Sequence, residues 1–223
     1  ILVVNHQVVA VAERVPAHVV GNGLLTIAEL VEQENQNPQR GKGHDNILTQ
    51  IEIDASTEEL LARQGYTLDT IVPLDEICYL RATANLSTGG IAIDRTDEIH
   101  PDTLWLAERV SHIIGLDVVG IDVITTDITK TLAEADGTIV EVNAAPGLRM
   151  HIAPSQGVGR NVAAPILKML FPPGTPTRIP IVAVTGTNGK TTTTRAIAHI
   201  FRQVYDAVGF TTTDGIYIGD RLI

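Results

Sequence analysis

A glycine-rich segment near the end of the sequence carries the clearest chemical pattern. A short apolar run ends at Val184, a turn with Gly186 and Gly189 follows, and Lys190 and Thr191 open a predicted helix. Glycines let the backbone approach an anion, and the N–H groups of such a turn point inward toward it. The lysine adds a positive charge for terminal phosphates, and the threonine hydroxyl can ligate Mg²⁺. The segment therefore predicts a site for a nucleoside triphosphate.

The general phosphate-loop pattern places a glycine five residues before Gly189, where this sequence has Val184. The compact form T-G-T-N-G-K-T-T resembles the ATP loop of the Mur ligase family, which joins amino acids to carboxylates. A turn of this composition with a purely structural role is the alternative, but strand, glycines, Lys-Thr pair and helix together favour the nucleotide. The predicted nucleotide-binding residues are Gly186, Thr187, Asn188, Gly189, Lys190, Thr191 and Thr192.

A second group consists of three oxygen-bearing side chains on two predicted strands. Asp122 lies in an apolar run, and Glu141 and Asn143 follow a polar connection. Because side chains alternate along a strand, Glu141 and Asn143 project from one face, and Asp122 faces the same point if the strands are antiparallel neighbours. Two carboxylates and an amide oxygen suit Mg²⁺ that bridges phosphates. On spacing alone, solvent-facing residues of an edge strand, or a turn that begins at Asn143, are an equal alternative.

Composition limits the classes of function. The chain has 223 residues, 44% of them hydrophobic and 19% charged, which is typical of a globular protein with a core. Sixteen basic against 26 acidic residues give a formal charge of −10, which argues against unspecific binding to nucleic acid or to an anionic membrane. No run reaches the ~18–20 apolar residues of a membrane span. Cys78 is the single cysteine, so no internal disulfide can form, and a reducing cytoplasm is the simplest setting.

Periodicity and turn signals predict the elements that position these groups. Thr26 with Glu29 and Ser56 with Glu59 are expected capping boxes of two helices. Four prolines in residues 171–180 disfavour helix and strand alike, so we predict a domain boundary there. Predicted strands cover 1–4, 8–15, 77–84, 91–93, 118–125, 138–142, the run before Thr185, and 207–211; predicted helices cover 26–35, 56–64, 101–114, 161–170 and 191–204; residues 37–45 are expected to be a mobile loop.

Further sequence segments make a family resemblance specific. Asp122, followed by Glu141-Val-Asn143 and Pro146-Gly147, resembles the metal-binding strands of the ATP-grasp ligases, which activate a carboxylate as an acyl phosphate and join it to an amine. An ATP-grasp C-terminal half followed by a Mur-type loop is similar to the cyanophycin synthetase family. The segments E-R-V-P-A-H-V-V-G (13–21), L-R-A-T-A-N-L-S-T-G-G (80–90) and V-N-A-A-P-G-L-R-M-H (142–151) fit that family closely.

The resemblance implies an α/β fold: an α+β ATP-grasp-like portion, then the first βαβ unit of a P-loop Mur ligase-type doubly wound sheet. Residues 1–171 are expected to be the C-terminal part of an ATP-grasp domain, and residues 172–180 a proline-rich linker. Residues 181–223 are expected to be a truncated N-terminal piece of a Mur ligase-like ATP-binding domain. Because both ends look cut, we expect a fragment that is catalytically inactive by itself.

The activity implied by the resemblance is the synthesis of multi-L-arginyl-poly-L-aspartate with ATP and Mg²⁺. The ATP-grasp module would add L-aspartate to the C-terminus of a cyanophycin primer, and the Mur-like module would attach L-arginine to each aspartyl β-carboxylate. The full-length protein is expected to be a homo-oligomer. Alternatives are another ATP-grasp/Mur-type ligase fusion with different amino acids, a nucleotide-binding module without ligation, and a polymer-binding scaffold that has lost catalysis.

The resemblance also implies roles for individual residues. Arg81, Arg149 and Lys190 are the catalytic candidates, and the two arginines are placed to bind a substrate carboxylate, although a solvated role is the commoner fate of any one arginine. His151 lies near the proposed site, where a structural role is expected. The expected metal ligands are Asp122, Glu141, Asn143 and Thr191, and the expected contacts to the polymer end or acyl phosphate are Asn85, Ser87, Thr88, Gly89, Gly90 and Arg149.

Overall fold

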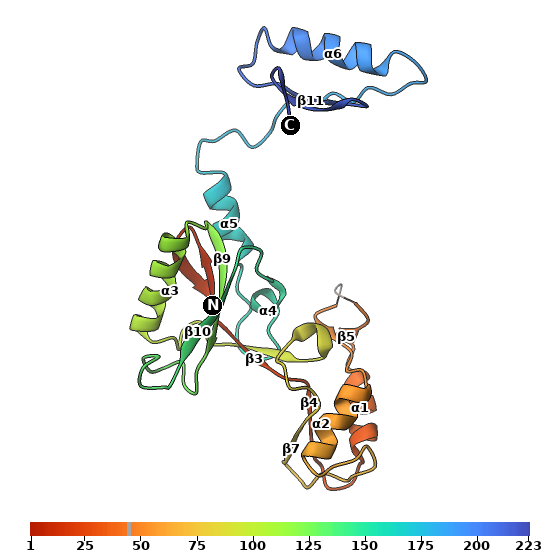
Figure 1. Cartoon of the computed structure of the whole chain (residues 1–223), viewed down its shortest axis with the longest axis vertical. Helices are drawn as coiled ribbons and strands as arrows, with labels where there is room; N and C mark the ends of the chain where they lie inside the picture. The colour runs from red at the N-terminus through yellow and green to blue at the C-terminus, as the bar shows by residue number, and fades with distance from the viewer. Residues whose placement is uncertain (44–45) are drawn as a thin grey trace. The chain divides into compact units, whose positions relative to one another are not determined.

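The computed structural model describes residues 1–43 and 46–223, which divide into two compact units, Ile1–Gly174 and Thr175–Ile223 (Figure 1). The α/β class expected from the sequence is confirmed. The loop expected at 37–45 extends into residues 44 and 45, which lie outside the described residues. Among the helices of the described residues, none combines the length and the apolar character needed to cross a membrane.

The first unit is built on a four-stranded antiparallel sheet with the order β10–β9–β1–β2. Its strands are β1 (Leu2–Val4), β2 (Gln7–Ala10), β9 (Val118–Ile124) and β10 (Thr138–Asn143). A tight turn joins β1 to β2 through Asn5 and His6, both with positive φ, as a two-residue hairpin turn of type I′ requires.

Helices pack against both faces of this sheet. Helix α3 (Pro101–Ile114) packs on one face against Val3, Val119 and Ile121. Helix α5 (Ala163–Leu170) covers part of the other face, where Leu2 and Val4 are buried. Figure 1 shows α3 on one side of the sheet and α5 with the short helix α4 (Arg149–Ile152) on the other. The second face is therefore apolar near α5 and open to polar side chains further along β9 and β10.

The run expected as one strand at 8–15 forms two strands in two different sheets. Val11 lies between them and exchanges hydrogen bonds with the backbone of Arg95 and the hydroxyl of Thr96. Beyond it, β3 (Ala12–Val15) pairs with β8 (Ile91–Asp94), and β4 (His18–Val20) pairs with β7 (Ile77–Tyr79). The strand expected at 77–84 ends at Tyr79, and a 3₁₀ turn, η1 (Leu86–Thr88), precedes β8.

A further core lies beside these short strands, under helices α1 (Ile27–Asn35) and α2 (Ala55–Arg63). Strands β5 (Arg40–Gly41) and β6 (Leu48–Thr49) pair in parallel next to it. The Thr26–Glu29 capping box is confirmed. The expected cap of the second helix is wrong, because Asp54 caps α2 and forms the box with Thr57.

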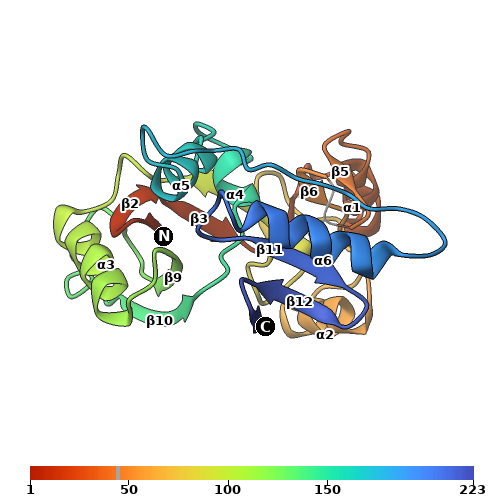
Figure 2. The same ribbon diagram turned by 90° about the horizontal axis from the view of Figure 1, so that it is seen from above.

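The second unit consists of helix α6 (Lys190–Phe201) and an antiparallel sheet of β11 (Gly209–Thr212), β12 (Gly215–Ile218) and β13 (Arg221–Leu222). Figure 2 shows α6 lying along this sheet. In the described part of this unit, the chain before Thr185 is not a strand, and β11 pairs with β12 instead of a parallel neighbour. The expected first βαβ unit is therefore not formed, because a parallel strand needs a neighbour to accept its backbone hydrogen bonds.

Candidate functional site

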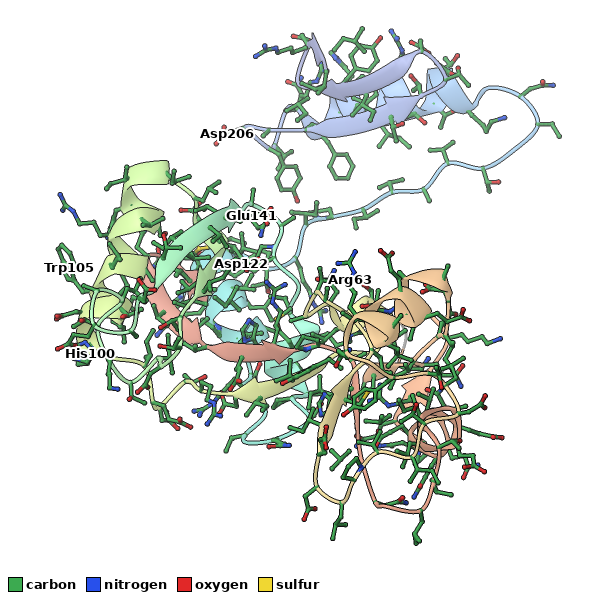
Figure 3. The ribbon with its side chains drawn as sticks, turned by 60° about the horizontal axis from the view of Figure 1, so that its bottom comes forward. Arg63, His100, Trp105, Asp122, Glu141 and Asp206 are labelled. Atoms are coloured by element: carbon green, nitrogen blue, oxygen red, sulfur yellow. The ribbon has the colours of Figure 1, made fainter. Side chains whose placement is uncertain are left out.

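Asp122 and Glu141 lie directly opposite each other on β9 and β10 (Figure 3). The two strands are antiparallel neighbours, and Asn143 lies opposite Gly120 in the same ladder. Side chains directly opposite in an antiparallel pair have Cβ atoms about 4.5–5.5 Å apart. Asp122, Glu141 and Asn143 therefore share one face of the sheet, the face opposite α3.

A β-bulge in β10 sets this arrangement. The register of β10 against β9 shifts by one residue between Ile139 and Glu141, which leaves Val140 as the extra, exposed residue. As a result Ile139 and Val142, three positions apart, both pack into the core under α3. A regular strand would turn one of them away. Because Ile139 and Val142 both pack against the core, the bulge turns Glu141 and Asn143 to the other face.

Gly120 leaves room at the centre of this face. A Cβ at this position would lie 2.8 Å from the Cβ of Pro146, so only glycine allows the chain after Asn143 to fold back over β9. This close approach places Pro146 against β9 two residues before Asp122. A glycine two residues before the aspartate therefore has a packing role here.

Arg14 is a member of this site that the sequence analysis missed. It lies on β3, in the other sheet, and its Nη2 donates to Oδ2 of Asp122 at 2.8 Å across a separation of 108 residues. The only sequence signal was a basic residue within the strand-like run that fits the family wording at 13–21. Its contact with Asp122 is tertiary, and no local pattern predicts it.

The glycine loop expected to contact substrate lies at the end of the β3–β8 ladder. Ile91, the first residue of β8, pairs with Val15, which follows Arg14 on β3. The loop closes on itself through hydrogen bonds from the backbone N–H groups of Gly90 and Thr88 to the carbonyl oxygen of Asn85. The loop is thus anchored one ladder position from the arginine that contacts Asp122.

Arg40, a second residue that the sequence analysis missed, holds this loop through a hydrogen bond to its backbone. Its guanidinium is buried, and its Nη1 donates to the carbonyl oxygens of Thr49 at 2.8 Å and Gly89 at 3.1 Å. Burial lowers the pKa of Arg40, and Glu34, 3.5 Å from Nη2, opposes that effect. The segment expected to be a mobile loop therefore contains an anchored arginine in its described part.

Arg81, Ser87 and Thr88 line one pocket of about 280 Å³, together with Thr49, Gln50, Glu52, Asp54 and Gly43. The guanidinium of Arg81 is already engaged: it donates to Asp54 at 2.8 Å and to the carbonyl oxygen of Glu52 at 2.9 Å, and it also contacts Ser56. Hydrogen bonds from Arg81, from Ser56 and from the backbone N–H of Thr57 hold the pKa of the Asp54 carboxyl well below its usual range. Arg81 therefore ties the N-terminus of α2 to the pocket wall.

Arg149 reaches the same wall from α4. Its Nη1 donates to the carbonyl oxygen of Asn46 at 2.9 Å, and its Nη2 lies 3.5 Å from the hydroxyl of Thr49. Both partners are neutral, so Arg149 keeps its positive charge available to an anion. His151, two residues further on, is buried, and burial lowers its pKa to about 4. It is therefore neutral at pH 7.

The phosphate loop of the second unit has the geometry that its glycines allow. Gly189 adopts φ of 76° as the residue before α6, a conformation that other residues rarely adopt. Nζ of Lys190 folds back over the loop and donates to the carbonyl oxygen of Gly186 at 2.7 Å, with that of Thr187 at 3.5 Å. The lysine and the first N–H groups of α6 therefore gather at one helix end, while Thr191 and Thr192 lie in its first turn.

The donor set on β9 and β10 fits a hard divalent cation. It offers two carboxylates and one amide oxygen from adjacent positions, which are ligands that Mg²⁺ accepts, usually with water and phosphate oxygens completing the shell. Within residues 1–43 and 46–223, no three His, Cys, Asp or Glu side chains are grouped so that they could hold a metal ion. The set therefore suits a cation that arrives with a phosphate.

Comparison with known proteins also divides the chain into two parts with different relatives. Residues 184–221 match the family model of the Mur ligase middle domain. The whole chain of 223 residues is 65% identical to a cyanophycin synthetase of Geminocystis herdmanii and 66% identical to one of Synechocystis sp.. The chain spans about a quarter of these relatives, 26% of the length of each.

The glutathione-forming proteins are more distant relatives. The chain is 38% identical over 172 residues to the glutathione biosynthesis bifunctional protein GshAB of Mannheimia succiniciproducens. This match covers 76% of the chain and 23% of that protein. The solved structure of a bifunctional glutathione synthetase from Pasteurella multocida matches 77% of the chain and 23% of its own, with a TM-score of 0.67 and 38% identity.

By class, this is a mixed α/β chain that shares most of its fold with a bifunctional glutathione synthetase, and its residues 184–221 are similar to the Mur ligase middle domain. The particular resemblance is to cyanophycin synthetase, and it is confirmed along the whole chain.

Proposed function

We propose that this chain is part of an ATP-dependent ligase of the cyanophycin synthetase type, with one ATP site in each unit. The first unit would add L-aspartate to the end of a cyanophycin primer, and the second would attach L-arginine to aspartyl β-carboxylates. The observation that carries the proposal is the opposition of Asp122 and Glu141 in the first unit, with a separate glycine–lysine phosphate loop in the second. The 65% identity to a cyanophycin synthetase over the full chain supports the choice of substrates.

The residues of the first unit would act mainly by binding and orienting. Asp122, Glu141 and Asn143 would hold Mg²⁺, which offsets charge on the phosphoryl group passing from ATP to the primer carboxylate. Arg149, whose two partners are neutral, would hold the carboxylate of the primer or of the incoming amino acid. Loop 85–90, held by Arg40 and by its own hydrogen bonds, would present Ser87 and Thr88 to the acyl phosphate. Arg81 would hold the N-terminus of α2 through Asp54 rather than touch the reacting atoms.

In the second unit, Lys190 would exchange the carbonyl oxygens of Gly186 and Thr187 for phosphate oxygens of ATP. Thr191 would complete the coordination of a second Mg²⁺. The amino-acid sites would lie in a longer protein, since the chain spans 26% of the length of its relative. That longer protein would form a homo-oligomer in the cytoplasm.

The test uses the full-length protein with ATP, Mg²⁺, a short aspartyl-arginine primer and each amino acid added separately. Lys190→Ala is expected to lower arginine addition by about 100-fold or more and to spare aspartate addition, because it removes charge stabilisation from one site only. Asp122→Asn is expected to do the reverse. Lys168→Ala and Asp102→Asn, which change exposed residues of α5 and α3, are the matched controls.

Two results would contradict the proposal. If both variants lost both activities equally while remaining folded, the assignment of one site to each unit would be wrong. If ATP were consumed only with amino acids other than aspartate and arginine, another ATP-grasp ligase would be the better assignment.

A further inference from the structure

The Arg14–Asp122 ion pair joins two sheets at the point where the metal is expected. Arg14 comes from β3 and Asp122 from β9, and their side chains are 35% and 25% exposed. The pair is therefore neither fully buried nor a loose surface contact. Its position, beside Glu141 in the ladder, makes it part of the charge balance of the site.

That balance needs a positive charge. Two carboxylates directly opposite in a ladder repel each other, and the repulsion favours any cation that can lie between or beside them. Arg14 supplies such a charge from 2.8 Å. A guanidinium N–H and a metal ion both use the lone pairs of a carboxylate oxygen, so the two compete for Oδ2 of Asp122.

Arg14 is also held lightly compared with the other arginines nearby. Arg160 makes hydrogen bonds through three nitrogens to Asp94 and Asp97, and Arg95 contacts both Glu13 and Glu98. The side chain of Arg14 makes a single hydrogen bond within the described residues, and a third of that side chain is exposed. Its guanidinium can therefore leave Asp122 without breaking a network.

We propose that Arg14 is the resident counter-ion of Asp122 and is displaced when a divalent cation binds there. Before nucleotide binds, the guanidinium blocks one ligand of the site and repels a free cation, so the site discriminates against metal alone. A cation that arrives with a triphosphate brings negative charge for the released guanidinium, so the exchange becomes favourable. Arg14 is thus a positioning residue that couples cation binding to nucleotide binding. This inference rests on the proposed function of the first unit.

The test measures Mn²⁺ binding to the full-length protein by electron paramagnetic resonance, without nucleotide and then with a non-hydrolysable ATP analogue. Arg14→Met keeps the length of the side chain and removes its charge. We expect it to tighten nucleotide-free Mn²⁺ binding by about tenfold, as removal of a like charge a few ångströms away predicts, and to weaken Mn²⁺ binding in the presence of the analogue. Arg14→Lys, which keeps the charge, should behave like the unaltered protein without nucleotide.

Two controls isolate the site. In an Asp122→Asn background, Arg14→Met should change Mn²⁺ binding by clearly less than in the unaltered protein, because the carboxylate oxygen for which guanidinium and metal compete is gone. This cycle also removes any contribution from the phosphate loop of the second unit. Glu13→Gln changes the neighbouring residue of β3 and breaks a different ion pair, to Arg95, so it should leave Mn²⁺ affinity unchanged. A tightening of binding cannot result from unfolding.

The outcomes separate this inference from the proposed function. If Asp122→Asn weakens Mn²⁺ binding but Arg14→Met leaves it unchanged or weaker without nucleotide, the metal site stands and the counter-ion role is wrong. If Asp122→Asn has no effect on Mn²⁺ binding in the presence of the ATP analogue, the metal site and the proposed function of the first unit fail together.

Discussion

At the scale of single residues, Asp94 and Arg160 fasten the chain that follows the candidate site. Arg160 donates to Oδ2 of Asp94 through Nη2 at 2.6 Å and Nε at 3.0 Å, and through Nη2 to Asp97 at 2.7 Å. The side chain of Asp94 is 8% exposed and that of Asp97 is 79% exposed. The two carboxylates thus share one guanidinium in very different surroundings, which provides a matched pair for experiment.

The pKa of Asp94 predicts how this pair contributes to stability. Burial disfavours its charged form, but hydrogen bonds from Arg160 and Thr96 outweigh burial and lower the pKa from 3.8 to about 2. A carboxyl whose pKa is lowered in the folded state stabilises the protein above its unfolded pKa, and this stabilisation is lost as the pH falls toward the folded value. Asp94→Asn is therefore expected to lower the free energy of unfolding by about 2 kcal/mol at pH 7.

Amide hydrogen exchange in β8, followed from pH 7 to pH 3, measures this effect. The difference between Asp94→Asn and the unaltered protein should be constant from pH 7 to about 5 and smaller at pH 3. Asp97→Asn should change stability by less than about 1 kcal/mol, because exposed ion pairs contribute little. An equal effect of the two substitutions, or one that grows in acid, would contradict this account.

At the scale of elements, helix α2 shows which of two neighbouring caps is used. Asp54 accepts a hydrogen bond from the backbone N–H of Thr57 at 3.0 Å and also accepts one from Arg81 at 2.8 Å. Ser56 lies inside the helix and donates to Asp54 at 2.6 Å. The structure therefore predicts that Asp54→Ala lowers the thermal unfolding midpoint more than Ser56→Ala does. If Ser56→Ala were the more damaging change in calorimetry, Ser56 would be the functional cap.

The same elements show how far sequence reasoning can reach. Local signals sufficed where the partner is a few residues away, as in the Thr26–Glu29 box and the helix that begins at Pro101 and ends at Ile114. Around α2, two overlapping cap patterns compete, and Arg81, 27 residues away, adds a hydrogen bond that favours Asp54. The alternation rule predicted that Glu141 and Asn143 share a face, but the bulge at Val140 depends on the core under α3.

Site residues that are held only by tertiary contacts could not be predicted from the sequence, because their partners are far away along the chain. Arg14 and Arg40 lie 108 and 49 residues from the partners that give them a role, Asp122 and Gly89. Arg81 was expected to bind substrate, yet its bonds run to Asp54 and to the backbone of Glu52. Sequence patterns identify residue types that can do chemistry, but the packing decides which of them are occupied with structural contacts.

At the scale of the whole molecule, the two units differ in how much core they have. The first unit contains three clusters of buried apolar side chains. In the described residues of the second unit, Ala198 is the one buried hydrophobic residue, and Ile181, Ile200, Ile216, Ile218 and Leu222 are exposed. A unit with so little buried apolar area gains little stability from the hydrophobic effect. We therefore expect that, in the 223-residue chain by itself, the second unit unfolds at a lower denaturant concentration than the first.

The segment between the units offers a direct test of the two-part organisation. Residues 171–180 are exposed throughout and contain no helix or strand, and Arg178 is the basic residue within them. Proteases cut exposed, irregular backbone far faster than helices or packed loops. Trypsin is therefore expected to cut the full-length protein after Arg178 at least about tenfold faster than after Arg149 or Arg160, which are held by hydrogen bonds. Arg178→Gln should remove this cut and leave the others unchanged in mass spectrometry. Cleavage first at Arg149 or Arg160, with Arg178 protected, would mean that residues 171–180 are packed rather than a linker.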